Sequence, residues 1–235
     1  SATPHFSICV YCGSRPGDKP EYAAAAVAVG QWIGAHGGQL VYGGGRSGLM
    51  GTVAEATRQA GGRVVGVIPQ ALVDKELANT ACDELHIVAN MHERKAMMAE
   101  RSNAFLALPG GIGTFEELFE VWTWRQLGYH DKPIGLLNTM GYYDHMLQFL
   151  DSSVSNGFMG DWQMGLIRHS ADITGLLQSL VEDAGMAAEA QNLRSVHHQW
   201  AGQPVRTRER NQHVSGGRRC QGLHKIAQAQ YFGTD

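Results

Sequence analysis

Residues 104–117 read Ala-Phe-Leu-Ala-Leu-Pro-Gly-Gly-Ile-Gly-Thr-Phe-Glu-Glu, and this stretch decides the fold. The apolar run 104–108 predicts a strand, and the apolar residues that follow Thr114 recur at the spacing of a helix. A strand therefore ends in a loop with three glycines, and a helix begins directly after the loop. Backbone N–H groups in such a loop can approach an anion closely, and the helix N-terminus adds the positive end of its dipole. The pattern favours a phosphate site in this loop.

Two adjacent carboxylates, Glu116 and Glu117, follow the loop one turn into the predicted helix. A site that only held phosphate would not need them, so the combination indicates chemistry on a sugar phosphate or a nucleotide. A purely structural alternative uses the same residues. Thr114 and Glu117 have the spacing of a capping box, in which Thr caps the helix and Glu bonds back to the Thr N–H. Such a cap needs neither the three glycines nor Pro109, which favours the functional interpretation.

On both sides of this stretch, short apolar runs alternate with helical stretches up to about residue 185. The predicted strands are 8–11, 39–42, 63–68, 84–88, 104–108, 133–137 and 166–168. The predicted helices are 21–36, 48–60, 91–102, 114–127, 142–155 and 171–183. This alternation predicts an α/β fold, a Rossmann-like doubly wound parallel sheet with helices on both faces. We expect residues 1–190 to form one nucleotide-binding domain, with its ligand beyond the C-terminal ends of the strands.

A second glycine loop, Gly43-Gly44-Gly45-Arg46-Ser47-Gly48, also lies between a predicted strand and a predicted helix. It matches G-x-G-x-x-G, the pattern of a dinucleotide-binding turn. A dinucleotide site also needs an acidic residue about 20 positions later, and the sequence has none there before Asp74. The Gly-Lys-Ser/Thr of a Walker loop is missing as well. We therefore expect this loop to handle a single phosphate or to form a tight turn.

A cationic pair, Arg94-Lys95, lies near the start of the predicted helix 91–102. Cations at that end of a helix oppose its dipole and are unfavourable unless they have an anionic partner. Arg can grip a phosphate or a carboxylate with two N–H groups, whereas Lys acts as a point charge. The alternative is a solvated helix face.

Composition bounds the class of protein. The chain has 235 residues, 43% of them hydrophobic, which suffices for one well-buried domain. No apolar run reaches the ~18 residues of a membrane span and no signal segment is visible, so we expect a cytoplasmic protein without a membrane partner. Cys9 and Cys12 are formally C-x-x-C but lie in an apolar run, so we expect buried, reduced thiols. The histidines are scattered, and we expect no metal site.

The C-terminal residues 191–235 differ in composition from the rest. They carry seven Lys and Arg against two Asp and Glu, and their few hydrophobic residues follow no evident period. We expect a mobile basic tail. A basic arm for nucleic acid is the functional alternative, but the tail lacks interleaved aromatics and a fold motif, so we expect no nucleic-acid partner.

Three segments taken together, 43–51, 91–95 and 109–117, resemble the LONELY GUY (LOG) family. The family's signature Pro-Gly-Gly-x-Gly-Thr-x-x-Glu is matched at every fixed position from Pro109 to Glu117, and its upstream Arg-Lys pair is matched by Arg94-Lys95. Cys12-Gly13-Ser14, the turn 42–45 and the helix 120–128 are also similar to that family. The resemblance spans about residues 6–183 and excludes the tail.

The resemblance implies a phosphoribohydrolase that cleaves cytokinin riboside 5′-monophosphates, and AMP as well, into free base and ribose 5-phosphate. It implies that Glu117 is the catalytic carboxylate and Arg94 its essential partner. Substrate-binding residues are expected in the two glycine loops and on the helices beside them: Gly44, Gly45, Glu76, Lys95, Gly110, Gly111, Ile112, Gly113, Thr114, Phe115, Glu116 and Thr123. The chemistry agrees, because a carboxylate can stabilise an oxocarbenium-like ribose and activate water without a metal or cofactor.

Two other classes of protein compete with this hypothesis. Relatives of the family have been labelled lysine decarboxylases, but Lys95 beside Arg94 suits a phosphate better than a pyridoxal phosphate Schiff base, so we reject that class. A non-catalytic nucleotide or cofactor carrier on the same fold would keep the phosphate loop but would not need both Arg94 and Glu117. We also expect a homodimer through helix 91–102 or 114–127, because the second helix is apolar around more of its circumference than one sheet requires.

Overall fold

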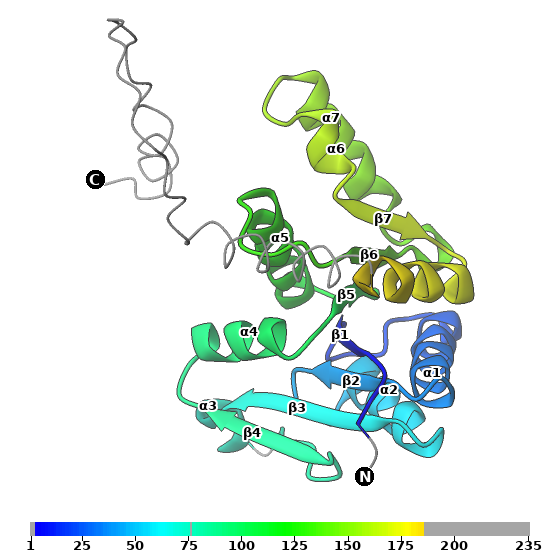
Figure 1. Ribbon diagram of the computed structural model, residues 1–235, viewed down its shortest axis with the longest axis vertical. Coiled ribbons are helices and arrows are strands. Elements are labelled where there is room, and N and C mark those ends of the chain that lie inside the picture. Colours follow the sequence, from blue (N-terminus) through cyan, green and yellow to red (C-terminus); the bar gives the residue numbers. More distant parts are fainter. Residues whose placement is uncertain (1–2, 76, 186–235) are drawn as a thin grey trace, which may run out of the picture. The chain divides into compact units, whose positions relative to one another are not determined.

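The computed structural model describes residues 3–75 and 77–185. Within them, parallel strands form one seven-stranded sheet in the order β4-β3-β2-β1-β5-β6-β7 (Figure 1). The strands are β1 (Ser7–Tyr11), β2 (Gln39–Tyr42), β3 (Arg63–Pro69), β4 (Glu84–Val88), β5 (Ala104–Ala107), β6 (Ile134–Leu137) and β7 (Ile167–Ser170). Each pair of neighbours is parallel, and in the central pair Cys9 of β1 lies opposite Phe105 of β5.

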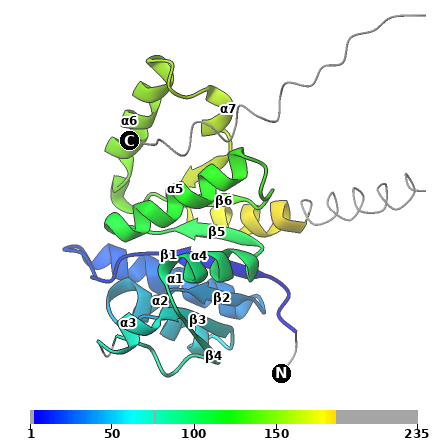
Figure 2. The same cartoon turned by 90° about the vertical axis from the view of Figure 1, so that its left-hand side faces the viewer.

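Helices cover both faces of the sheet, as Figure 2 shows from the side of α4 and α5. The helices are α1 (Pro20–Ala35), α2 (Gly48–Gln59), α3 (Gln70–Val73), α4 (Met91–Glu100), α5 (Ile112–Gln126), α6 (Asp144–Ser155), α7 (Asp161–Met164), a 3₁₀ turn η1 (Thr139–Gly141) and a helical segment over residues 173–185. One hydrophobic cluster joins the sheet to α1, α2 and the segment 173–185. The other joins it to α4, α5 and α6. The predicted doubly wound Rossmann-like fold is confirmed.

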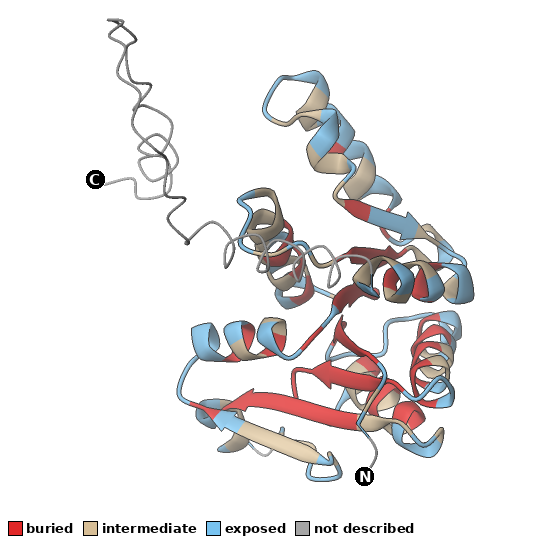
Figure 3. Ribbon diagram, viewed as in Figure 1, coloured by how far each residue is buried: buried red, intermediate tan, exposed pale blue. Residues whose placement is uncertain are grey.

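Strand β1 shows how the sequence produces this layering. Ile8 and Val10 face the cluster with α1 and α2, whereas Cys9 and Tyr11 face the cluster with α4 and α5. Successive side chains of a strand point to opposite faces, so a strand buried on both sides must be apolar throughout. Figure 3 shows the central strands buried and the edge strand β4 mostly of intermediate exposure. The order of strands reverses beside β1, and its C-terminal end therefore marks the switch point of the fold.

Helix α5 begins earlier than predicted, at Ile112 instead of Thr114. Its N-cap is Gly111, which has no side chain to cap with, so the capping-box interpretation of Thr114 and Glu117 is wrong. A Cβ on Gly110 would overlap the Thr114 hydroxyl, which shows that Thr114 is folded back against the loop from inside the first turn. The four-residue helix α7 was not predicted, because one turn is too short to show a period.

Several expectations concern other parts of the chain. Glu76 and the tail 191–235 lie outside the described residues. Among the described helices, none combines the length and apolar character that crossing a membrane requires. Cys9 and Cys12 are buried free thiols, as predicted, and Cys82 is free as well.

Candidate functional site

A cavity of about 360 Å³ opens at the switch point, where β1, β2 and β5 end. Open parallel sheets bind ligands at such a point, and the volume is in the range of small-molecule sites. The polar and charged residues that line the cavity are Ser14, Arg94, Thr114, Glu116 and Glu117. Its larger apolar lining residues are Met50, Ile68, Leu72, Leu77 and Met91. The cavity therefore offers charged groups beside an apolar wall.

The N-terminus of α5 supplies unpaired backbone donors to this cavity. The first hydrogen bond inside the helix runs from the Phe115 N–H to the Gly111 carbonyl, at 3.1 Å. The N–H groups of Ile112, Gly113 and Thr114 precede it and have no partner within the helix. All three residues line the cavity. Free N–H groups together with the helix dipole suit an anion, and binding of a phosphate here stays a prediction.

Arg94 is buried at the start of α4, with 7% of its surface exposed, so the alternative of a solvated helix face is wrong. Its Nε donates to the Val67 carbonyl at 3.0 Å, and its Nη2 donates to the Gly43 carbonyl at 2.7 Å. These bonds fix the guanidinium against the ends of β2 and β3. A Cβ on Gly43 would overlap the guanidinium, which explains why glycine stands there. The charge of Arg94 is thus held rigidly at the cavity wall.

Glu117 projects into the same cavity from the second turn of α5. Burial raises the pKa of its carboxyl to about 7. The positive charge of Arg94 lowers the pKa of Glu117, and the negative charge of Glu116 raises it. Lys95 lowers this pKa and Glu120 raises it by smaller amounts. Both residues line the cavity, and among the ion pairs of the described residues none joins Arg94 to Glu117. A carboxyl that is half ionised near neutral pH suits acid–base chemistry.

Lys95 of α4 pairs with two carboxylates of α5, and its expected contact with substrate stays a prediction. Its Nζ donates to Glu116 at 2.5 Å and to Glu120 at 2.9 Å, and only 8% of its side chain is exposed. It does not line the cavity. Because Lys95 neutralises the two carboxylates on either side of Glu117, Glu117 is the one carboxylate of this group without an ion pair among the described residues. Lys95 thus affects the charge balance around Glu117 without lining the cavity.

The structure brings most of the expected site residues together. The residues that line the cavity are Gly45, Arg94, Gly111, Ile112, Gly113, Thr114, Glu116 and Glu117. The described residues that do not line it are Gly44, Lys95, Gly110, Phe115 and Thr123.

Each residue outside the cavity wall has a local reason for its position. Gly44 has a φ of +71° and lies against Ile68 and Leu85, so it makes the turn after β2. The ring of Phe115 packs against the ring of Tyr143, with the two ring centroids 6.3 Å apart. Thr123 follows Glu117 by six residues, which places it roughly 9 Å further along α5. For these residues, a contact with substrate stays a prediction.

No site role was predicted from the sequence for the apolar wall or for the loop after β1, although Cys12-Gly13-Ser14 is one of the family-like segments. Gly13 and Ser14 line the cavity, and the Gly13 carbonyl accepts hydrogen bonds from the N–H groups of Leu49 and Met50 at the start of α2. Because this loop directly follows β1, which ends at the switch point, its position in the sequence could have predicted that it lines the cavity. The apolar wall comes from four separate segments, and no local pattern joins them.

Comparisons with known proteins find a family model and curated relatives that match most of the described domain. The family model described as "Possible lysine decarboxylase" matches residues 50–180. The "Probable cytokinin riboside 5′-monophosphate phosphoribohydrolase LOGL9" of Oryza sativa subsp. japonica is 50% identical over 175 residues, which cover 74% of this chain and 77% of the relative. The cytokinin riboside 5′-monophosphate phosphoribohydrolase LOG3 of Arabidopsis thaliana is 48% identical over 177 residues, which cover 75% of this chain and 82% of that relative.

A solved structure shares the fold at lower sequence identity. The Moco carrier protein from Chlamydomonas reinhardtii aligns with a TM-score of 0.59 over 79% of this chain and 99% of that protein. Its sequence is 23% identical, so the likeness concerns the fold alone.

Proposed function

Because the chain belongs to the LONELY GUY family of cytokinin riboside 5′-monophosphate phosphoribohydrolases, we propose that it hydrolyses the N-glycosidic bond of these nucleotides. The products are the free N6-substituted adenine and ribose 5-phosphate. The observation that carries the proposal is the Glu117 carboxyl, whose pKa is about 7, in one cavity with Arg94 and the free N–H groups of α5. We propose AMP as a further substrate, since it has the same phosphate, ribose and purine.

The mixed lining of the cavity suggests how the nucleotide lies. The 5′-phosphate accepts hydrogen bonds from the N–H groups of Gly113 and its neighbours at the start of α5. The ribose then lies beside Glu117. The base extends toward the apolar wall of Leu72, Leu77 and Met91, which suits a purine with an apolar N6 substituent. The glycosidic bond is thereby placed between the phosphate anchor and the base, next to the carboxylate.

In the proposed mechanism, Glu117 acts in its ionised form. As the bond from C1′ to the base nitrogen breaks, the bonding electrons leave with the base and C1′ becomes oxocarbenium-like. The Glu117 carboxylate stabilises this charge and takes a proton from the water that attacks C1′. The departing base gains a proton from solvent. Arg94 opposes the effect of burial on Glu117 and so keeps part of the carboxyl ionised at neutral pH.

The direct test is to incubate the protein with AMP or with isopentenyladenosine monophosphate and to detect released base by chromatography. Glu117→Gln should retain the fold and lose activity by on the order of 10²-fold or more. A non-catalytic carrier is the alternative, and it predicts nucleotide binding without release of base. Near-normal turnover by Glu117→Gln would exclude the proposed role of this carboxylate.

Lysine decarboxylation, which the name of the family model suggests, suits the described lysines poorly. Lys95 is paired with two carboxylates, and Lys132 donates to the Ala99 carbonyl at 2.6 Å. A Schiff-base lysine must instead reach the carbonyl carbon of pyridoxal phosphate from within the cavity. Lys19 and Lys75 are exposed and do not line the cavity.

We further infer that the active unit is a homodimer that includes α5. Leu118 and Trp122 of this helix are buried against the sheet, whereas Phe119 and Leu127 stay exposed at 37% and 43%. Unpaired apolar side chains on a helix that carries the catalytic group favour a second copy of the chain as their cover. Light scattering should give twice the chain mass at micromolar concentration. A monomer with full activity would contradict this.

We also infer a cytoplasmic location. The support is that Cys9, Cys12 and Cys82 are free thiols, as expected in a reducing compartment. Fractionation of the producing cells would test it.

A further inference from the structure

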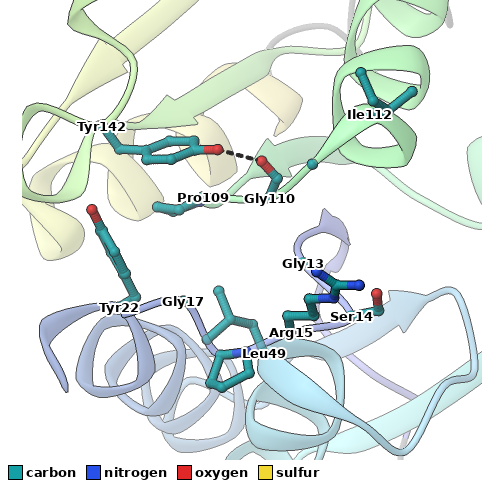
Figure 4. Close-up of a pocket in the computed structure, with 12 residues that line it drawn as sticks. Gly13, Ser14, Arg15, Gly17, Tyr22, Leu49, Pro109, Gly110, Ile112 and Tyr142 are labelled. Carbon is teal, nitrogen blue, oxygen red and sulfur yellow. Dashed lines mark hydrogen bonds between the residues drawn. The ribbon is translucent and has the colours of Figure 1, made fainter. Parts of the chain in front are cut away.

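A second cavity, of about 470 Å³, adjoins the one that holds Glu117. It lies between the loop after β1, the loop after β5 and the turn after β6, and Figure 4 shows its walls. The two cavities share Gly13, Ser14, Gly111 and Ile112. The shared residues include Gly111, the N-cap of α5, and Ile112, its first residue, so a phosphate bound there would lie at the border between the cavities. The proposed monophosphate substrate leaves the second cavity unfilled.

The far end of this cavity is aromatic. Tyr22 of α1 and Tyr142 meet edge to face, with ring centroids 5.8 Å apart and planes at 76°. In Figure 4 the Tyr142 ring lies on the side of Pro109 and Gly110, and Tyr22 stands at the end away from Ile112. Tyr142 also meets Tyr143 edge to face, with ring centroids 4.9 Å apart, and 39% of the residue stays exposed and accessible to another flat group.

The position of Tyr142 is fixed by several contacts. Its hydroxyl donates to the Gly110 carbonyl at 2.5 Å, and the hydroxyl of Tyr143 donates to the Leu108 carbonyl at 2.6 Å. The preceding turn contains Met140 with a φ of +56°, the one non-glycine residue with positive φ among those described. Strain of this kind persists only where surrounding contacts impose it, and it occurs often at binding sites. The ring is therefore held over the phosphate loop.

Arg15 adds a positive charge to the same cavity. It is exposed, and no hydrogen bond or ion pair occupies its guanidinium among residues 3–75 and 77–185. In Figure 4 the guanidinium lies on the side of Gly13 and Ser14, away from Tyr22. A free guanidinium in the cavity that adjoins the phosphate loop suits a second phosphate, because it binds two phosphate oxygens at once.

We propose that the second cavity is a subsite for the distal half of a pyrophosphate-linked dinucleotide. One nucleoside occupies the Glu117 cavity with its phosphate at the start of α5, as in the proposed function on which this inference rests. The second phosphate lies at Arg15, and the second base stacks on Tyr142. The ligand class thus extends from nucleoside monophosphates to dinucleotides joined through their phosphates. The glycine motif at 43–48 takes no part in holding the second nucleoside.

Calorimetry with two ligands tests this subsite. AMP and P1,P2-di(adenosine-5′) pyrophosphate are titrated into the full chain carrying Glu117→Gln, so that neither ligand is consumed. Stacking of a base on an aromatic ring leads us to expect that the dinucleotide binds on the order of tenfold more tightly than AMP. Adding Tyr142→Ala should abolish this preference and leave the Kd of AMP unchanged.

Two matched variants separate the ring from its surroundings. Tyr142→Phe keeps the ring and loses only the hydroxyl bond to Gly110, so it should retain the preference. Tyr129→Ala removes another exposed tyrosine, one that lines neither cavity, and should change nothing. Equal affinities for the two ligands, or a preference that survives Tyr142→Ala, would overturn the subsite. Failure of AMP itself to bind would instead overturn the proposed function.

Discussion

Replacing Glu117 by glutamine should make the folded protein more stable, and only at the higher pH values. The carboxyl has an ordinary pKa of 4.5 when the chain is unfolded, and burial raises it to about 7 in the fold. Between these two values the unfolded state loses its proton while the folded state retains it. The free energy of unfolding therefore falls as the pH rises from about 4.5 to about 7. At 1.36 kcal/mol for each pKa unit, the full loss is about 3 kcal/mol.

Glutamine has the same shape and no proton to lose, so Glu117→Gln avoids this loss. The Tm of the variant should match that of the parent near pH 4.5 and exceed it by about 6–12 °C at pH 8. Differential scanning calorimetry across this pH range measures the difference directly. Glu21→Gln, an exposed carboxylate on α1, is the matched control and should show no such trend. A Tm difference for Glu117→Gln that does not grow with pH would refute the reasoning.

Three further expectations concern activity. Because the ionised form of Glu117 is the active one, kcat/KM for AMP should rise with pH and level off above about 7. A pH–rate profile that falls through this range would contradict the role of Glu117 as the base that activates water. Gly43→Ala should displace the Arg94 guanidinium and lower kcat by on the order of 10²-fold while the far-ultraviolet circular dichroism stays unchanged; full activity would show that the position of Arg94 does not matter. Adenosine lacks the 5′-phosphate anchor and should be a poor substrate, so comparable kcat/KM values for adenosine and AMP would argue against the phosphate site.

The fold could be predicted because its signals are local. Strand β1 is an apolar run and α1 follows it with alanine-rich helical character, and the same alternation continues to β7. Parallel strands joined by helices leave little choice of architecture. The first residue of α5 was harder to predict, because Thr114 has the sequence pattern of a helix cap. Only the fold shows that its hydroxyl lies against Gly110.

The candidate site could be predicted as far as its motifs reach. Arg94 and Glu117 each lie in a distinctive segment, and both line the cavity. The ion pairs of Lys95 with Glu116 and Glu120 join α4 to α5 through residues 21 and 25 positions apart, so the sequence cannot show them. The pKa of Glu117 likewise depends on burial by distant segments.

The most direct test of the account is the release of base from isopentenyladenosine monophosphate, measured by chromatography for the parent and for Glu117→Gln under the same conditions. The parent should form equal amounts of free isopentenyladenine and ribose 5-phosphate, and the variant should bind the nucleotide but release base at least ~10²-fold more slowly. A parent protein that binds the nucleotide and releases no base would contradict the central claim, as would a variant with the rate of the parent.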